Sequence, residues 1–125
     1  YAGYWYRLDV VRTLPDEVVV ATTEVGLPAA MNPGKTIIDL TGLNDTRIAR
    51  RGFSADYILN ILAPDLIYLP HQHYTRMRGE LMGHPDFRGY EHRGEGLLGT
   101  EMGIAVRRNS PHYAALARAL LGQPD

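Results

Sequence analysis

The 125-residue chain contains no cysteine. Disulfides and thiolate metal sites are therefore excluded, whereas the redox compartment stays open because cysteine-free domains occur on both sides of a membrane. The apolar runs are far shorter than the roughly 18 residues that a membrane-spanning helix requires. The net charge is −1, and no block of like charge is longer than the pairs Arg50-Arg51 and Arg107-Arg108. Without a basic stripe, we expect no nucleic-acid partner.

Signature motifs of several enzyme classes are also missing. The chain has no Walker pattern and no G-x-G-x-x-G after its first predicted strand, so a nucleotide fingerprint is absent. A G-x-S-x-G nucleophile elbow is absent too, and Ser54 and Ser110 are explained as helix caps. Nothing in these patterns indicates a bound cofactor, and we predict none.

The composition is that of an ordinary globular domain, with 45% hydrophobic and 22% charged residues. A chain of this length can bury one sizeable core, so we predict a single soluble domain spanning residues 1–125. The first residue is Tyr1, and no charged segment followed by an apolar one precedes the predicted elements. We interpret the chain as a fragment of a longer protein.

Short apolar runs alternate with segments of helical periodicity. The runs predict strands over 17–23, 36–40 and 65–69, and a less regular hairpin over 90–93 and 102–107. Helices are predicted before Pro15, from Asn44 or Asp45 to Arg51, from Ser54 to Pro64, over 74–82, and from Ser110-Pro111 to Gly122, with a short helical turn around residues 27–31. This alternation predicts an α/β three-layer sandwich with a mostly parallel, Rossmann-like sheet and an antiparallel hairpin at one edge.

Gly52 is predicted to end the helix before it. The apolar faces are predicted at Tyr57, Ile58, Ile61 and Leu62 in the segment after Ser54 and at Tyr113, Leu116, Ala117 and Leu120 in the closing helix, and Phe87 and Tyr90 are predicted to anchor their loop in the core.

Two acids follow two predicted strands at the point where each strand ends. Glu24 comes after the first strand, and Asp39 lies at the end of the second. Ligands bind open α/β sheets at the carboxyl ends of their strands, so these acids are candidate ligand-binding residues if the strands are adjacent. Asn44 and Asp45 open the following helix, where they can cap its first turn and also face a ligand.

The histidines suggest no specific metal centre. His71 and His73 follow the third strand and could form a mixed site with Asp39 or Glu24, but a His-x-His pair without further ligands at suitable spacing favours a solvated loop. The other histidines are assigned to loops or to the starts of helices: His84, His92 and His112. We predict no metal site.

Three stretches together resemble a known family. The run 20–26 (Val-Ala-Thr-Thr-Glu-Val-Gly), the run 38–45 (Ile-Asp-Leu-Thr-Gly-Leu-Asn-Asp) and Ile48-Ala49 look like the soluble C-terminal domain of bacterial multi-spanning glycosyltransferases of the GT-C type. These are the mannosyl- and arabinofuranosyltransferase-like membrane proteins. Looser similarity continues through 64–67 and through His84-Pro85, Phe87 and Tyr90, so that the resemblance spans about the first three quarters of the chain.

The resemblance implies a function for the domain. The parent enzymes use polyprenyl-phosphate sugars, and their catalytic carboxylate is expected on an external loop of the membrane portion, so no catalytic residue is assigned here. The fragment is expected at the periplasmic or extracellular face of the cytoplasmic membrane, with its own transmembrane domain as partner. Its expected role is to position an acceptor glycan or polyprenyl-linked sugar through Glu24, Asp39, Asn44 and Asp45.

Two other classes of function remain open from the residues alone. One is a structural or protein-interaction module, in which the polar strand ends hold loops rather than a ligand. The other is a small metal-dependent hydrolase that uses His71, His73 and a strand-end acid. The first predicts that Asp39 supports stability, and the second predicts a metal ion retained through purification.

Overall fold

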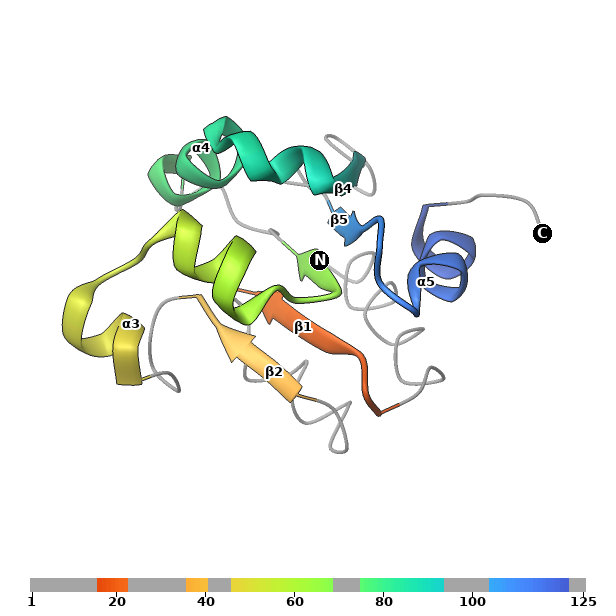
Figure 1. Cartoon of the computed structure of the whole chain (residues 1–125), viewed down its shortest axis with the longest axis horizontal. Coiled ribbons are helices and arrows are strands. Elements are labelled where there is room, and N and C mark those ends of the chain that lie inside the picture. The colour runs from red at the N-terminus through yellow and green to blue at the C-terminus, as the bar shows by residue number, and fades with distance from the viewer. Residues whose placement is uncertain (1–15, 23–35, 41–45, 69–74, 94–103, 122–125) are drawn as a thin grey trace.

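The computed structural model describes residues 16–22, 36–40, 46–68, 75–93 and 104–121 (Figure 1). These segments form a five-stranded sheet in the order β2-β1-β3-β5-β4. The strands are β1 (Val19–Thr22), β2 (Thr36–Asp39), β3 (Leu66–Tyr68), β4 (Tyr90–Arg93) and β5 (Ile104–Arg107). β1 pairs in parallel with β2 and β3, whereas β5 is antiparallel to β3 and to β4.

The α/β class and the antiparallel hairpin at one edge are therefore confirmed. The described sheet is mixed rather than mostly parallel, because β5 enters between β3 and β4 in the opposite direction. β4 and β5 are consecutive in the described sheet and antiparallel, and only a crossover of a dozen or more residues can join parallel neighbours. A glycine-bearing connection of ten residues, 94–103, permits a hairpin and not a crossover.

The register of the parallel strands brings their ends to one edge of the sheet. Thr22 is the partner of Asp39 on one side and of Tyr68 on the other. All three side chains are buried, at 0%, 2% and 1% exposure. We call this edge, where β2, β1 and β3 end at Asp39, Thr22 and Tyr68, the carboxyl edge. In Figure 1 the arrowheads of β1 and β2 point to the same side.

Helices lie against both faces of the sheet. The helical elements are α3 (Thr46–Arg51), the π-helix η1 (Tyr57–Leu62), α4 (Thr75–Gly83), the 3-10 helix η3 (Pro85–Gly89) and α5 (Tyr113–Leu120). One buried cluster joins strand residues such as Ala21 and Ile67 to α3, η1, α4 and η3. The other joins alternate strand residues such as Val20 and Leu66 to α5. Successive side chains of a strand point to opposite faces of the sheet. A continuous apolar run therefore supplies apolar side chains to both faces.

Helix α3 ends as the sequence predicts. Gly52 has a φ of +82°, the left-handed conformation that favours glycine, and its N–H donates to the carbonyl of Ile48 at 2.8 Å. Arg50 and Arg51 occupy the last turn, where positive charge complements the helix dipole. Ile48 is buried and anchors the helix to the core.

The segment after Ser54 differs from the predicted α-helix. The hydroxyl of Ser54 accepts a hydrogen bond from the N–H of Tyr57 at 3.2 Å, which confirms the cap. The turns are π-helical, however, with the Ala63 N–H donating to the Ile58 carbonyl at 2.9 Å. The wider turn rotates the buried face onto Ile58 and Leu59 and leaves Ile61 63% exposed. The prediction that Ile61 belongs to the buried face is therefore wrong.

The closing helix starts later than predicted. α5 begins at Tyr113, because Pro111 and His112 form a turn instead of the first helical residues. The Ser110 hydroxyl accepts from the His112 N–H at 2.9 Å and donates to Asp65, so it holds this turn. The predicted apolar face is confirmed, with its buried residues at Leu116, Ala117 and Leu120.

Asp65 is the centre of a buried polar cluster at the end of the sheet opposite the carboxyl edge. One oxygen, Oδ2, accepts the Val19 N–H at 2.8 Å. The other, Oδ1, accepts from Arg107 Nη2 at 2.9 Å and from Ser110 Oγ at 2.6 Å. The side chain is only 7% exposed. We call Asp65, Arg107 and Ser110 the Asp65 cluster; it joins β1, β5 and the approach to α5.

Tyr90 lies close to this cluster. Its hydroxyl donates to the Pro64 carbonyl at 2.7 Å, and its ring stacks on Phe87 with centroids 5.9 Å apart. Burial raises the pKa of Tyr90 above the ordinary value, and Asp65 adds to the rise while Arg107 opposes it. The prediction that Phe87 and Tyr90 anchor the core is confirmed, since both are buried.

Several predicted features lie outside the described residues: the helix before Pro15, the turn around residues 27–31, and the start of the helix at Asn44 or Asp45. Within the described segments, no helix combines the length and apolar character needed to span a membrane.

Candidate functional site

The carboxyl edge carries the one predicted ligand-binding residue that the structure describes. Asp39 ends β2 and is only 2% exposed. The strand pairing continues one residue further, with the Leu40 N–H donating to the Thr22 carbonyl at 3.0 Å. The site prediction requires that the first two strands be adjacent. The structure meets this condition, because β1 lies between β2 and β3.

The other predicted site residues lie outside the described segments. Glu24 follows the end of β1 by two residues in the sequence, and Asn44 and Asp45 immediately precede α3. Asp39 also takes part in an interaction of its own within the fold. A buried carboxylate can shape the surface above it but can reach a ligand directly only if that surface opens. Asp39 therefore has the position of a supporting group.

Helix α3 adds positive charge next to this edge. It begins after β2 with only residues 40–45 between them, and in Figure 1 it lies on the side toward which β1 and β2 point. Three arginines on it are exposed: Arg47, Arg50 and Arg51. The guanidinium carbon of Arg47 lies 4.2 Å from the centre of the Tyr57 ring, so this arginine is stacked against η1.

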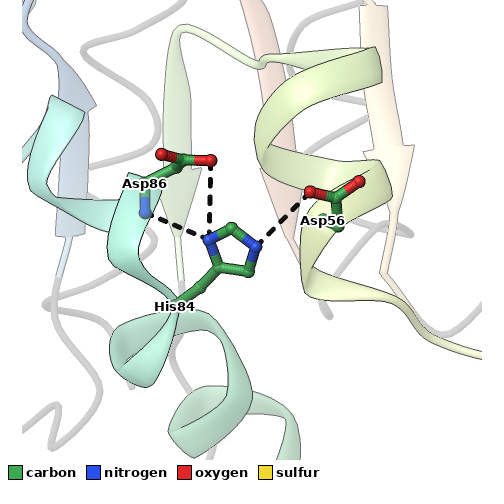
Figure 2. Close-up of side chains that lie close together, drawn as sticks. All are labelled: Asp56, His84 and Asp86. Atoms are coloured by element: carbon green, nitrogen blue, oxygen red, sulfur yellow. Dashed lines mark hydrogen bonds and ion pairs between the residues drawn. The ribbon is translucent and has the colours of Figure 1, made fainter.

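A second group of polar side chains lies where η1 meets η3 (Figure 2). His84 precedes η3 and points between two carboxylates: its Nε2 is 3.4 Å from Asp56 Oδ1, and its Nδ1 is 3.8 Å from Asp86 Oδ2. The Asn60 amide nitrogen lies 2.8 Å from Asp56 Oδ1 and 2.9 Å from Asp86 Oδ2. We call Asp56, Asn60, His84 and Asp86 the His84 cluster.

The hydrogen bonds of the cluster define the state of the imidazole. His84 Nδ1 accepts the Asp86 N–H at 3.0 Å, which caps the first turn of η3. In the neutral ring, Nε2 then carries the proton and donates toward Asp56. Asn60 gives one amide hydrogen to each carboxylate, so the two acids share a donor. The cluster thus fastens η1 to η3 in its hydrogen-bonded form.

The same residues are the group that could hold a metal ion among the described residues. One ligand atom each from Asp56, His84 and Asp86 lie within 4.8 Å of one another. An ion would need the lone pair on Nδ1 that the Asp86 N–H now occupies, or the position on Nε2 that carries the proton. It would also displace the Asn60 amide from between the carboxylates. The geometry therefore suits a structural contact better than a metal centre.

Sequence reasoning assigned His84 to a loop and missed this cluster. The signal was local, because a histidine before Pro85 and Asp86 can cap a short helix that has proline in its first turn. The partners Asp56 and Asn60 are 28 and 24 residues away, and their approach depends on the π-helical turn. His71 and His73, the histidines considered for a metal site, lie outside the described residues.

We expect replacement of His84 by alanine to lower the free energy of unfolding by about 1 kcal/mol, the usual cost of a lost helix cap. Asparagine should retain most of that stability because its carbonyl oxygen can also accept the Asp86 N–H. Urea unfolding followed by circular dichroism measures both values. His112→Ala is the matched control, since His112 precedes α5 without a side-chain cap bond. Equal losses for alanine and asparagine would contradict the capping role.

Comparison with known protein families decides the family of the chain. A family model described as a domain of unknown function, DUF8728, matches residues 2–118. The chain belongs to this family. The match covers all the described strands and most of α5. The mixed sheet therefore belongs to the DUF8728 domain itself. Neither the curated proteins nor the solved structures include a match to the chain.

Proposed function

We propose that this DUF8728 domain binds an acceptor glycan at its carboxyl edge for a membrane glycosyltransferase of the GT-C type, without catalysing the transfer itself. The observation that carries the proposal is the parallel alignment of β2, β1 and β3, which places Asp39 at an edge shared by three strand ends. Such edges are the usual ligand sites of open α/β sheets. The resemblance of residues 20–26 and 38–45 to GT-C domains supports the choice of glycan.

The proposal assigns different roles to the predicted residues. Asp39, buried beneath the edge, holds the surrounding backbone in place. Direct contact with sugar hydroxyls is assigned to Glu24, Asn44 and Asp45, whose carboxylate and amide groups accept and donate hydrogen bonds in fixed directions. In this proposal the whole domain is a Rossmann-like three-layer sandwich that faces the periplasm or cell exterior beside its own transmembrane portion.

Binding fits the described groups better than catalysis. Among the residues that define the carboxyl edge, Asp39 is the one acid, and both it and the phenol of Tyr68 are buried. In the His84 cluster the imidazole and both carboxylates are engaged in hydrogen bonds, of which the one from Asn60 to Asp86 joins η1 to η3. A transferase that keeps its reacting groups elsewhere needs from such a domain only affinity and orientation of the acceptor.

The test is a titration of the isotopically labelled domain with short oligosaccharides, followed by NMR. We expect chemical-shift changes at Glu24, Asn44 and Asp45, with smaller changes at Asp39, at millimolar ligand. Asn44→Ala should weaken binding severalfold because it removes an amide that pairs with hydroxyls. Glu80→Gln on the exposed side of α4 is the control and should bind as the parent does. No shift at the carboxyl edge at millimolar sugar would overturn the proposal.

A second candidate function, a structural or protein-interaction module, is favoured by the burial of Asp39. In that case the carboxyl edge serves stability alone. Asp39→Asn would then lower the free energy of unfolding, while Glu24→Gln and Asn44→Ala would leave the activity of the parent protein intact. Measuring these three variants for stability and for activity separates the two functions.

A further inference from the structure

The arginines of α3 lie on one side of the helix. Arg47, Arg50 and Arg51 are spaced i, i+3 and i+4, so they project from neighbouring positions on the helix surface. All three are exposed. We call them the arginine face. α3 packs close to the end of β2, because its Ile48 lies in the same core cluster as Ile38 and Leu40.

The positive charge of this face exceeds what the helix requires. The C-terminus of a helix carries roughly half a negative charge, which one arginine more than balances. Arginines at i+3 and i+4 from one another repel and destabilise a helix. Some other exposed arginines have acidic partners, since Arg76 pairs with Glu80 and Arg108 with Glu91, whereas Arg88 donates to the Pro85 carbonyl. Within the described segments, no ion pair joins the arginine face to an acid of this chain.

One member of the face is already positioned. Arg47 lies over the Tyr57 ring at 4.2 Å, and this stacking restricts a side chain that is otherwise mobile. A guanidinium held in this way presents its planar donors to solvent and matches the two oxygens of a carboxylate or phosphate. Arg50 and Arg51 supply two further cations beside it. The arrangement suits an anionic ligand whose charges are spaced along a chain.

We propose that the glycan bound at the carboxyl edge is acidic, and that the arginine face pairs with its anionic groups. The proposal rests on the proposed function and names the class of its ligand. Sugar hydroxyls are bound at the strand ends, and carboxylates or phosphates on the same glycan reach Arg50 and Arg51. A neutral glycan of equal length makes only the first set of contacts and binds more weakly.

The experiment compares trigalacturonate with maltotriose, which has the same length and no charge, by NMR titration at low salt. We expect the acidic trisaccharide to bind about tenfold more tightly, the effect of two or three exposed ion pairs, and to lose most of this advantage at high salt. The double variant R50Q/R51Q, which keeps Arg47, should lose most of the preference for the acidic trisaccharide. Arg76→Gln, which removes an exposed arginine from α4, is the matched control and should keep the preference.

The outcomes separate this inference from the function on which it rests. Equal affinities for the two trisaccharides, or a preference that survives R50Q/R51Q, would overturn the acidic ligand and leave glycan binding in place. No binding of either trisaccharide would overturn the proposed function. Two further arms use a phosphorylated sugar and inorganic phosphate. Binding of inorganic phosphate as tight as that of both acidic sugars would show an anion site without sugar recognition and would also overturn the inference.

Discussion

Replacing Asp65 by alanine is expected to lower the free energy of unfolding by about 2–4 kcal/mol. The side chain is buried and accepts three hydrogen bonds, from the Val19 N–H, Arg107 Nη2 and Ser110 Oγ. Its removal leaves the guanidinium of Arg107 without the carboxylate at 2.9 Å and leaves the start of β1 without an acceptor. The unpaired Val19 amide and Ser110 hydroxyl carry most of this cost, because the Arg107 side chain is 25% exposed and still donates to Asn109 at 2.7 Å. Urea unfolding of the 125-residue chain measures it.

Two further variants make the Asp65 experiment specific. Asp65→Asn keeps the shape of the side chain and one acceptor oxygen but loses the charge. The stability of this variant should therefore lie between that of the parent and that of Asp65→Ala. Glu80→Ala removes an acid of the exposed Arg76–Glu80 pair and should change stability by less than about 1 kcal/mol. If Asp65→Ala also costs less than about 1 kcal/mol, the Asp65 cluster does not hold the sheet together.

Replacing Tyr90 by phenylalanine is expected to cost about 1–3 kcal/mol. The ring can keep its stacking on Phe87, but the Pro64 carbonyl loses the hydroxyl that donates to it at 2.7 Å. Pro64 is buried, so water replaces that donor poorly. The difference in urea midpoint between the parent and Tyr90→Phe reports the bond. An unchanged midpoint would show that the carbonyl finds another donor.

Tyr90 also makes stability depend on pH at the alkaline end. Burial raises its pKa in the folded protein above the ordinary value of about 10 in the unfolded chain. The stability from this shift is complete below pH 10 and declines as the pH rises above it, because only the unfolded chain then releases the proton easily. The slope is at most about 1.4 kcal/mol per pH unit. Tyr90→Phe should therefore lose stability less steeply as the pH rises above about 10.

Local features of this fold were predictable because they depend on neighbouring residues. Gly52 ends α3 in the left-handed conformation that glycine favours, and Ser54 caps the next helical segment. The β-branched run at Val19–Thr22 forms a strand buried on both faces, as its continuous apolar character indicates. Each of these predictions needed a window of only a few residues.

Features that depend on distant residues were not predictable in the same way. The π-helical turn that exposes Ile61 ends at Ala63 with a φ of +42°, and no residue type in that segment signals it. The insertion of β5 between β3 and β4 depends on pairing across the whole chain. Ser110 had the sequence of a helix cap, but its hydroxyl bonds to Asp65, 45 residues earlier. Tertiary contacts outweighed the local preference.

In the candidate site, too, local features were predictable from the sequence and features that depend on distant residues were not. The strand-end position of Asp39 was predictable from an apolar run that ends in an acid, and the parallel pairing with β1 confirms the setting. The burial of its side chain was not predictable, because it depends on what covers the edge. The His84 cluster required η1 and η3 to meet, which sequence spacing does not indicate.

The strand order has a consequence for the order of folding. β4 is made before β5, yet in the described sheet its one neighbour is β5, so it has no strand to join until residues 104–107 have been synthesised. The Asp65 carboxylate likewise cannot form its hydrogen bonds with Arg107 and Ser110 until those residues have been synthesised. Contacts between residues far apart in the sequence, such as Asp65 and Arg107, slow folding. A nascent chain that stops before β5 should therefore keep β4 unpaired and be open to proteases, and the domain should become resistant only after its last strand has been added.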